Sequence, residues 1–507
     1  MSGNMICGPI MVIICLATCT PVAAQVNGWE EMIGDIPIIH VYGSDYEMGY
    51  ALGYLDGDRW NYKMENDMIQ WLGAPTYESV CSQYYDYFTV PQRLDDIAEG
   101  VIDGLSARPD SACYSPSLGR DFNEVDFHVS NSIVDICAII MKDGRRSCTS
   151  LSAWDAATAG DPELQGAPAM ARNYDGSFDP VMNKVPSVIA MAPDEGHQTV
   201  LCGWTLELDC SSGMNEYGIC LTRNASNNEF VYVLEPLFVP IGYAIFLGLL
   251  EEDFDSSGTC DLEDLLTAVT FWNRSPSRII HALGPRNLGY MGEPAVVVEI
   301  NNAEGYVFRY AEDDSVLTPD HLAATNHHRL LYPPIYCLRY ELLQDSITAD
   351  PEMSLERLWW LMGDCSLPSA YTKMTLLFLP ETQEIGIAFA DSLQQSWEKE
   401  PQWIEWSQLF PPEGVEGESM DTAISLEPIY PNPSTGTFTA EFNIASTENI
   451  SLLLFDVSGR VIGGITSEEF NAGRHSVEFS GIPSGVYYCR LMRSGITATG
   501  SVVVIND

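Results

Sequence analysis

A short linker divides this chain of 507 residues into two parts whose sequence patterns differ. The linker, residues 410–423, reads FPPEGVEGESMDTA, and its Pro and Gly residues disfavour regular structure. Before it, β-rich runs such as residues 295–310 alternate with helical patterns such as residues 355–363. After it, residues 424–507 contain only short alternating segments between turns. We therefore expect an α+β unit, with antiparallel sheets covered by helices, followed by a small all-β sandwich.

The composition is that of a folded and strongly acidic protein. Hydrophobic residues make up 46% of the chain, which is enough for packed cores, and the formal net charge is −47. That charge excludes nucleic acid as a partner, because binding to phosphates needs clustered Lys and Arg. No segment after the N-terminus reaches the ~20 uninterrupted apolar residues of a membrane-spanning helix. The nearest, residues 236–250, contains Pro240 and Gly242 and predicts a buried helix or hairpin.

The N-terminus has the pattern of an export signal. Residues 9–20 are largely apolar, and residues 22–24 (VAA) form a small-residue cleavage pattern. Residues 1–24 are therefore predicted to be a signal peptide, with a lipoprotein signal at Cys19 as the alternative.

The cysteine count indicates at least one free thiol. Of 14 cysteines, three lie in the signal (Cys7, Cys15 and Cys19), which leaves an odd number, 11. The others could form disulfides, for example among Cys202, Cys210 and Cys220, but the sequence does not give the pairing. Their spacing does not suggest zinc.

Cys148 opens a strand-like run that leads to a compact polar turn. After residues 150–158 and a turn, the run MARNYDGSF places Arg172, Asn173 and Asp175 close to a β-turn. A lone Cys in an exported protein is usually half of a disulfide, so Cys148 gains meaning only from these neighbours.

With these neighbours the sequence resembles the choloylglycine hydrolase and isopenicillin-N acyltransferase branches of the N-terminal-nucleophile superfamily, over about residues 38–395. The resemblance implies a four-layer αββα fold in which the catalytic Cys begins a strand. Cys148 would be the nucleophile, Arg172 would stabilise its thiolate or orient the substrate, and Asp175 would hold the amine. The α-amine of an N-terminal Cys, with a reference pKa of about 7.7–8.0, can serve as general base without a His.

Two further segments fit the same resemblance. The turn at residues 215–218 and the strand after it lead to Asn224, which matches an Asn that donates its amide to the oxyanion; a plain turn cap is the alternative. The run LAATNHHRLLYPP places Asn326 at the position of a second active-site Asn, which orients the nucleophile. Arg339, shortly after it, would anchor the adjoining helix.

The late segment departs from the bile-salt-type members. Where those members carry an Arg near the nucleophile, this chain offers only Ser369, Thr372 or Lys373. This departure argues against a close bile-salt substrate and moves the match toward the acyltransferase branch. The resemblance as a whole implies a small-molecule acyl-amide substrate, with hydrolysis and acyl transfer both open.

Because Cys148 is internal, the resemblance implies a precursor. Attack of its thiol on the Ser147 carbonyl, followed by hydrolysis, would free the new amine. Residues 25–147 would remain bound as a small subunit beside a catalytic unit of residues 148–409; removal of the segment by another protease is the alternative. The start of residues 25–147 resembles the acyltransferase proregion, because Glu47, Gly49 and Gly53 stand at matching positions.

The last segment resembles a second family. The runs IYPNPSTG, LFDVSGRVI and SGVYYCRL, in this order within residues 424–507, look like the C-terminal sorting domain of the bacterial type IX secretion system. The resemblance implies the secretion machinery as a partner, and a destination at the cell surface or in the medium. A generic adhesive or carbohydrate-binding sandwich is the alternative.

Two clusters of charged residues are candidate metal sites. Residues 253–264 match much of a calcium-loop template through Asp253, Asp255, Ser257, Asp261 and Asp264, with Gly258 at the turn. The twelfth position is Asp instead of Glu, and a polar loop whose Asp261 caps the next helix is the simpler interpretation. His327 and His328 are adjacent and would point apart on an extended loop. We expect no metal and no cofactor.

Two other functions compete with a cysteine amidase or acyltransferase. A phospholipase-B-like lipid hydrolase would use the same nucleophile and self-cleavage. A non-catalytic binding protein displayed through the sorting domain would not need a thiol at the start of this strand.

Overall fold

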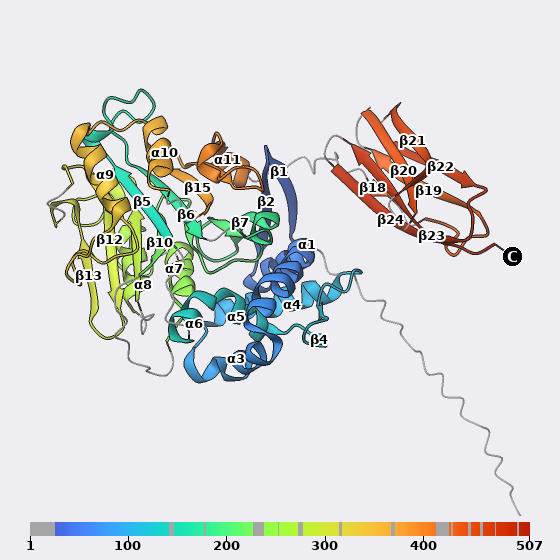
Figure 1. The fold of residues 1–507 in the computed structure, drawn as a ribbon, viewed down its shortest axis with the longest axis horizontal. Helices are drawn as coiled ribbons and strands as arrows, with labels where there is room; N and C mark the ends of the chain where they lie inside the picture. The colour runs from blue at the N-terminus through green and yellow to red at the C-terminus, as the bar shows by residue number, and fades with distance from the viewer. Residues whose placement is uncertain are drawn as a thin grey trace, which may run out of the picture. The chain divides into compact units, whose positions relative to one another are not determined.

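The computed structural model describes residues 26–140, 147–176, 179–226, 238–251, 253–271, 277–313, 317–366, 371–411, 425–426, 429–444, 448–456, 460–471, 473–493 and 496–506. The predicted signal peptide and most of the linker lie outside them. The chain forms two compact units, Met1–Phe410 and Pro411–Asp507 (Figure 1).

The larger sheet of the first unit has the order β1-β2-β7-β8-β9-β10-β11-β12-β13. Its neighbours are antiparallel except β2 and β7, which pair in parallel with Ile38 opposite Val188. Because β1 and β2 precede Cys148, the segment before the predicted cut completes this sheet. The strands are β1 Gly28–Ile33, β2 Ile36–Gly43, β7 Pro186–Pro193, β8 Thr199–Trp204, β9 Ser212–Asn215, β10 Cys220–Ala225, β11 Ser277–Leu283, β12 Ala295–Asn301 and β13 Gly305–Arg309.

The smaller sheet has the antiparallel order β14-β5-β6-β15-β16-β17. Almost every residue of its central strands is buried, including the polar residues of β5 and β6, so these strands are covered on both faces. They are β14 His321–Ala324, β5 Ser147–Ala153, β6 Ala169–Gly176, β15 Tyr371–Leu379, β16 Glu384–Phe389 and β17 Gln402–Glu405.

The two sheets share one buried cluster. It includes Ile279 and Val297 of the larger sheet and Met374 and Ile387 of the smaller one. A polar bridge crosses between the same faces, because the Ser150 and Ser152 hydroxyls lie 3.0 and 2.8 Å from the two ring nitrogens of His281. Burial, with Arg309 nearby, lowers the pKa of His281 to about 3, so the ring is neutral and acts as a bridge.

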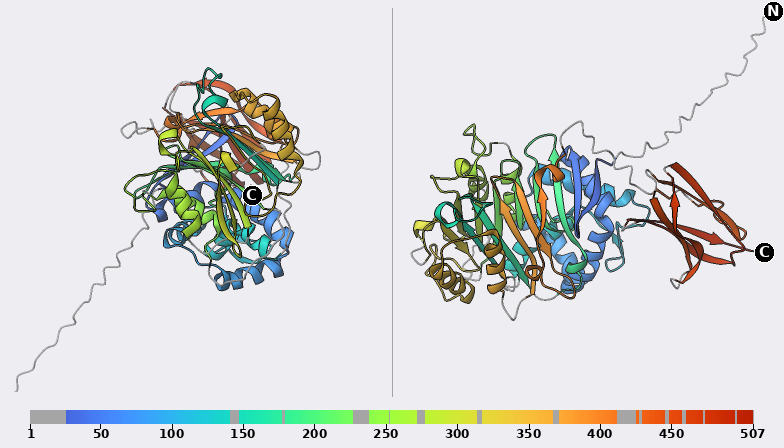
Figure 2. Two further views of the ribbon diagram at one scale, coloured as in Figure 1. Left: turned by 90° about the vertical axis from the view of Figure 1, so that its left-hand side faces the viewer. Right: turned by 90° about the horizontal axis from the view of Figure 1, so that it is seen from above.

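Helices pack against the other face of each sheet (Figures 1 and 2). Trp60, Phe127 and Phe246 cover the larger sheet, and Tyr340 and Trp359 cover the smaller one. The first unit is therefore a mixed α/β structure built on two sheets. The helices over the larger sheet are α1 Asp45–Lys63, α3 Ala74–Tyr87, α4 Gln92–Ala107, α5 Glu124–Asn131, α6 Ile133–Ile140, α7 Ile241–Leu250 and α8 Leu262–Phe271; those over the smaller are α9 Leu338–Ala349 and α10 Leu355–Asp364.

The β-rich run at residues 295–310 and the helical pattern at residues 355–363 are present as the hairpin β12–β13 and as α10. The apolar pattern of residues 36–57 predicts a strand along the whole run, but the strand ends at Gly43 and the rest is helical. Ser44 begins α1 with a capping box, in which its hydroxyl accepts from the Glu47 N–H and the Glu47 carboxylate accepts from the Ser44 N–H.

The glycines of α1 serve helix packing. A Cβ at Gly49 would lie 2.2 Å from the Ile97 carbonyl oxygen, and one at Gly53 would lie 2.1 Å from that of Val101. Because only glycine allows the backbones of α1 and α4 to approach this closely, the spacing Glu47-Gly49-Gly53 is explained by a cap and a helix crossing.

The apolar run before residue 251 forms α7, and all ten of its residues are buried. This confirms the prediction of a buried helix. Among the helices of the described ranges, none has the length and apolar character needed to cross a membrane.

The second unit is all β. A sheet of order β18-β19-β22 and a sheet of order β21-β20-β23-β24 enclose a core that includes Phe438, Phe442, Leu454 and Leu491. β21 was not expected, because Gly463 and Gly464 interrupt its alternation. The strands are β18 Ser425–Leu426, β19 Thr437–Ile444, β20 Glu448–Asp456, β21 Val461–Phe470, β22 Gly473–Ser480, β23 Gly485–Arg493 and β24 Ile496–Val504.

Cys202, Cys210 and Cys220, the cysteines considered for pairing, are all free thiols. Cys202 and Cys220 lie in the cluster between the sheets, whereas Cys210 lies on the opposite face of the larger sheet. Cys202 and Cys220 are also separated by β9, a distance of about 9–10 Å between strands, beyond the ~7 Å limit for a disulfide. The pairings considered among these three cysteines are therefore absent.

Candidate active site

Cys148 is the second residue of β5 and is 2% exposed. It pairs with Tyr174 of β6, and its side chain belongs to the cluster between the two sheets. Arg172, two residues before Tyr174, therefore reaches the same space, and its Nη2 donates to Cys148 Sγ at 3.5 Å. The guanidinium is therefore in hydrogen-bonding contact with the thiol.

Arg172 is fully buried and is held by the larger sheet. Its Nη2 also donates to the Arg223 carbonyl oxygen at 3.1 Å, and its Nη1 donates to the Ser212 hydroxyl. It lies over the Tyr174 ring, 5.0 Å from the centroid. These contacts fix the guanidinium beside the thiol.

Asn326 follows β14 and contacts the backbone of the nucleophile. The Cys148 N–H donates to Asn326 Oδ1 at 2.8 Å, and Asn326 Nδ2 donates to the Ala225 carbonyl oxygen at 2.6 Å. The side chain thus joins β5 of one sheet to β10 of the other.

Asn224 lies one residue before Ala225 at the end of β10 and is buried. Its Nδ2 donates to the Thr325 carbonyl oxygen at 3.3 Å, and among described residues its Oδ1 has no hydrogen-bond partner. A buried amide with an unused polar atom can donate or accept toward a substrate once it is reoriented.

Asp175 is buried on the other face of β6, where it meets Arg339 of α9. Arg339 Nη1 lies 3.7 Å from Asp175 Oδ2, and the Thr372 hydroxyl donates to Asp175 Oδ1 at 2.7 Å. Burial raises the pKa of Asp175 to about 6, although the Arg339 charge and the Thr372 hydrogen bond both lower it. Asp175 is the cross-strand partner of Ser147, the residue on the other side of the predicted cut.

Arg339 joins several of these groups. It donates to the Cys148 carbonyl oxygen, to Thr149 Oγ1 at 2.8 Å and to Asn326 Oδ1 at 2.6 Å. The sequence suggested only that it anchors a helix, because its partners lie up to 191 positions away.

The structure therefore brings the five predicted residues into one connected group. Cys148 contacts Arg172 and Asn326 directly, Asn224 joins through the Thr325 backbone, and Asp175 joins through Arg339.

The residues considered for the late position have other contacts. Lys373 Nζ lies 3.9 Å from Asp179 Oδ2, Thr372 holds Asp175, and Ser369 lies outside the described residues. His328 is stacked on Tyr332 with ring centroids 5.2 Å apart. Burial lowers the pKa of His328, which favours a neutral ring.

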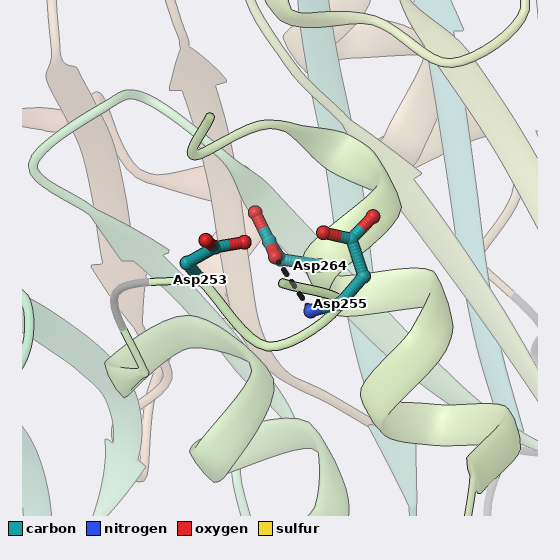
Figure 3. A group of neighbouring side chains, drawn as sticks. All are labelled: Asp253, Asp255 and Asp264. Atoms are coloured by element: carbon teal, nitrogen blue, oxygen red, sulfur yellow. Dashed lines mark hydrogen bonds between the residues drawn. The ribbon is translucent and has the colours of Figure 1, made fainter. Parts of the chain in front are cut away.

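The acidic loop before α8 is drawn in Figure 3. Asp253, Asp255 and Asp264 each have a carboxylate oxygen within 4.8 Å of the others. Asp253 accepts from the Ser257 and Gly258 N–H groups, and Asp264 Oδ1 accepts from the Asp255 N–H at 3.1 Å, the dashed line in the figure. These hydrogen bonds account for the fold of the loop, and calcium binding stays the untested alternative to a plain polar loop.

Asp261 lies directly before α8. Its Oδ1 accepts from the Glu263 N–H at 2.8 Å, and its own N–H donates to Asp264 Oδ2 at 3.0 Å. These contacts agree with a role in capping the helix.

Solved structures similar to this chain include two amide hydrolases. One is a Caenorhabditis elegans N-acylethanolamine-hydrolyzing acid amidase ortholog, at 13% identity and a TM-score of 0.33, over 46% of this chain and 93% of the other. Another is a mutant of conjugated bile acid hydrolase from Clostridium perfringens, at 13% identity and a TM-score of 0.33, over 52% of this chain and 93% of the other.

No curated protein sequence matches the chain. Residues 428–505 do match a family, described as the secretion system C-terminal sorting domain. The match coincides with the second unit and with the three runs identified in the sequence, which confirms that prediction. The second unit is therefore a sorting domain of the type IX secretion system, which directs the protein to the cell surface or the medium.

Proposed function

We propose that this protein is a secreted cysteine hydrolase or acyltransferase of the N-terminal-nucleophile type, which acts on an amide through a thioester on Cys148. The observation that carries the proposal is the buried Arg172 guanidinium 3.5 Å from Cys148 Sγ, with Asn326 bound to the backbone nitrogen of the same residue. The two sheets with helices on their outer faces support the four-layer αββα fold that such enzymes require.

The enzyme matures by cutting itself before Cys148. The thiol attacks the Ser147 carbonyl carbon, the peptide nitrogen leaves as the Cys148 α-amine after taking up a proton, and a thioester results. Water then hydrolyses the thioester, which releases a carboxylate on Ser147 and restores the thiol. Asp175, opposite Ser147 and buried with an Oδ2 that accepts no hydrogen bond among the described residues, is a suitable acceptor for the new amine.

In the mature enzyme the free amine acts as the general base. It takes the proton of the thiol, which attacks the substrate carbonyl beside Asn224. The Asn224 amide then donates to the oxyanion, an interaction worth roughly 3–4 kcal/mol in other enzymes. The protonated α-amine returns its proton to the substrate nitrogen, the C–N bond breaks, and the amine product leaves as the thioester forms. Water or a second amine resolves the thioester, so hydrolysis and acyl transfer differ only in the acceptor.

The segment before the cut stays bound as a small subunit. Its β2 pairs with β7 along six residues, and its Trp60 and Phe127 share a core with Phe246. Asp135 of α6 adds a buried ion pair to Arg278, with an N···O distance of 3.0 Å.

Intact-mass analysis of wild type, Cys148→Ala and Cys260→Ala decides the proposal. We expect two fragments, with a new N-terminus at Cys148, in wild type and in the control Cys260→Ala. Cys260 is a half-buried thiol outside the site. Cys148→Ala should stay one chain. The fragments should co-elute in native buffer and separate in denaturant. An uncut wild type that turns over no amide or ester would falsify the proposal; turnover of lipid esters alone would favour the phospholipase-B-like alternative.

A further inference from the structure

We propose that Glu299 is a positioning residue that fixes the loop bearing Asn326 against Cys148. The inference rests on the proposed function, since it concerns the geometry of the same nucleophile. Glu299 belongs to β12 of the larger sheet and is fully buried, at a position where an apolar side chain would be expected.

The Glu299 carboxylate binds three successive backbone amides of the loop. The N–H groups of Arg329, Leu330 and Leu331 donate to its oxygens at 2.8, 2.9 and 2.9 Å. Burial raises the pKa of Glu299, but the Arg309 charge and these three amides outweigh it and hold the pKa below its usual value. The group therefore remains an anion, and each amide bonds to a charge.

Arg309 links the same carboxylate to the chain before Asn326. Its Nε donates to Glu299 Oε1 at 3.0 Å, and its Nη2 donates to the Ala323 carbonyl oxygen at 2.7 Å. One buried ion pair thus holds the chain three residues before Asn326 and again three residues after it.

The loop between these two anchors carries both contacts that matter for the nucleophile. Asn326 binds the Cys148 N–H, and the Thr325 carbonyl oxygen receives the Asn224 amide. A buried ion pair is often replaceable by apolar residues without loss of stability. The Glu299–Arg309 pair therefore serves to fix the position of the loop. A fixed loop in turn aligns Cys148 with Asn224.

The first test follows the loop itself and does not depend on activity. Deuterium uptake is measured in the peptide that spans residues 323–332, for wild type, Glu299→Gln and Glu299→Asp in the full chain. The Asp variant keeps the charge beside Arg309 but withdraws it by about one methylene, and it remains informative if the Gln variant does not fold. Glu304→Gln makes the same chemical change at an exposed position of the β12–β13 hairpin. We expect faster uptake in the Glu299 variants only; uptake equal to wild type overturns the proposal.

The second test asks whether Glu299 acts through Asn326. A misplaced loop should lower kcat and the self-cleavage rate by about 10²-fold with KM little changed. Asn326→Ala should lower them similarly, and the double variant should be no worse than either single one. Multiplied losses, or a loss confined to KM, would overturn the positioning role. A wild type without cleavage or turnover refutes the proposed function instead, while the uptake measurement still decides whether Glu299 holds the loop.

Discussion

The stability of the site should depend on the charge balance between Arg339 and Asp175. The perturbation is Arg339→Met, which keeps most of the side-chain volume and removes the charge. Arg339 is 3% exposed and Asp175 is 0% exposed, so solvent cannot replace the lost partner. Removing one member of a buried ion pair costs about 3–5 kcal/mol, because the other charge is left uncompensated.

The double variant Arg339→Met/Asp175→Asn should recover part of that loss. The Asn side chain removes the stranded charge, and its oxygen can still accept from the Thr372 hydroxyl. We therefore expect the double variant to be more stable than Arg339→Met alone at pH 8. At pH 5 the recovery should shrink, because the pKa of Asp175 is already raised to about 6 and the carboxyl is mostly neutral there.

Urea unfolding followed by tryptophan fluorescence measures this effect. All 11 tryptophans precede residue 411, so the signal reports only on the first unit. The Cys148→Ala background keeps the chain uncut. Arg286→Met is the control. Arg286 and its partner Asp155 are both exposed, so this change should cost at most about 1 kcal/mol. The reasoning would be refuted if the losses of stability in the single variants Arg339→Met and Asp175→Asn simply add in the double variant.

Four further outcomes follow from the structure. Asn224→Ala should keep KM and lower turnover ~10²–10³-fold in a steady-state assay, and unchanged turnover would remove it from the oxyanion site. Because Asp175 binds its proton more tightly in the folded chain, protonated Asp175 stabilises the fold below about pH 4, and this stabilisation is lost as pH rises to 6. The urea midpoints of Cys148→Ala with and without Asp175→Asn should therefore diverge across that pH range. Midpoints that change in parallel would contradict this prediction. Gly53→Ala should lower stability by about 1–3 kcal/mol through contact with the Val101 carbonyl, whereas Gly160→Ala, which meets only the tip of Glu352, should not. Removal of all residues after Phe410 should leave the first unit folded but retained in the periplasm by cell fractionation, and normal export of the truncated chain would contradict a sorting role.

Local patterns in the sequence predicted the elements well where one periodicity dominates. α10 and the β15–β16 hairpin are examples, because their apolar residues recur at helical or strand spacing. The start of α1 was missed, since VYGSDYEMGYALG is apolar at both spacings and only the Ser44 cap decides between them. β21 was missed because its glycines hide the alternation.

The site was predictable only as a set of residues along the chain. Cys148, Arg172, Asp175, Asn224 and Asn326 were chosen by resemblance, and they form one connected group. The groups that hold them, Arg339 and Glu299, act across 191 and 32 positions of sequence. No spacing rule links such positions, because pairing between the sheets and loops decides which residues meet.

The parallel pairing of β2 with β7 affects whether this protein can refold after denaturation. Before the cut, closing that sheet is a unimolecular event within one chain. In the proposed mature form the same strands would belong to two molecules, and rejoining them would depend on concentration and compete with aggregation. In the dilute medium outside a cell a denatured enzyme would not reassemble, so its working lifetime is set by the rate of unfolding and not by an equilibrium. The cut would then be irreversible in effect, and cleavage should occur only after the precursor has folded completely.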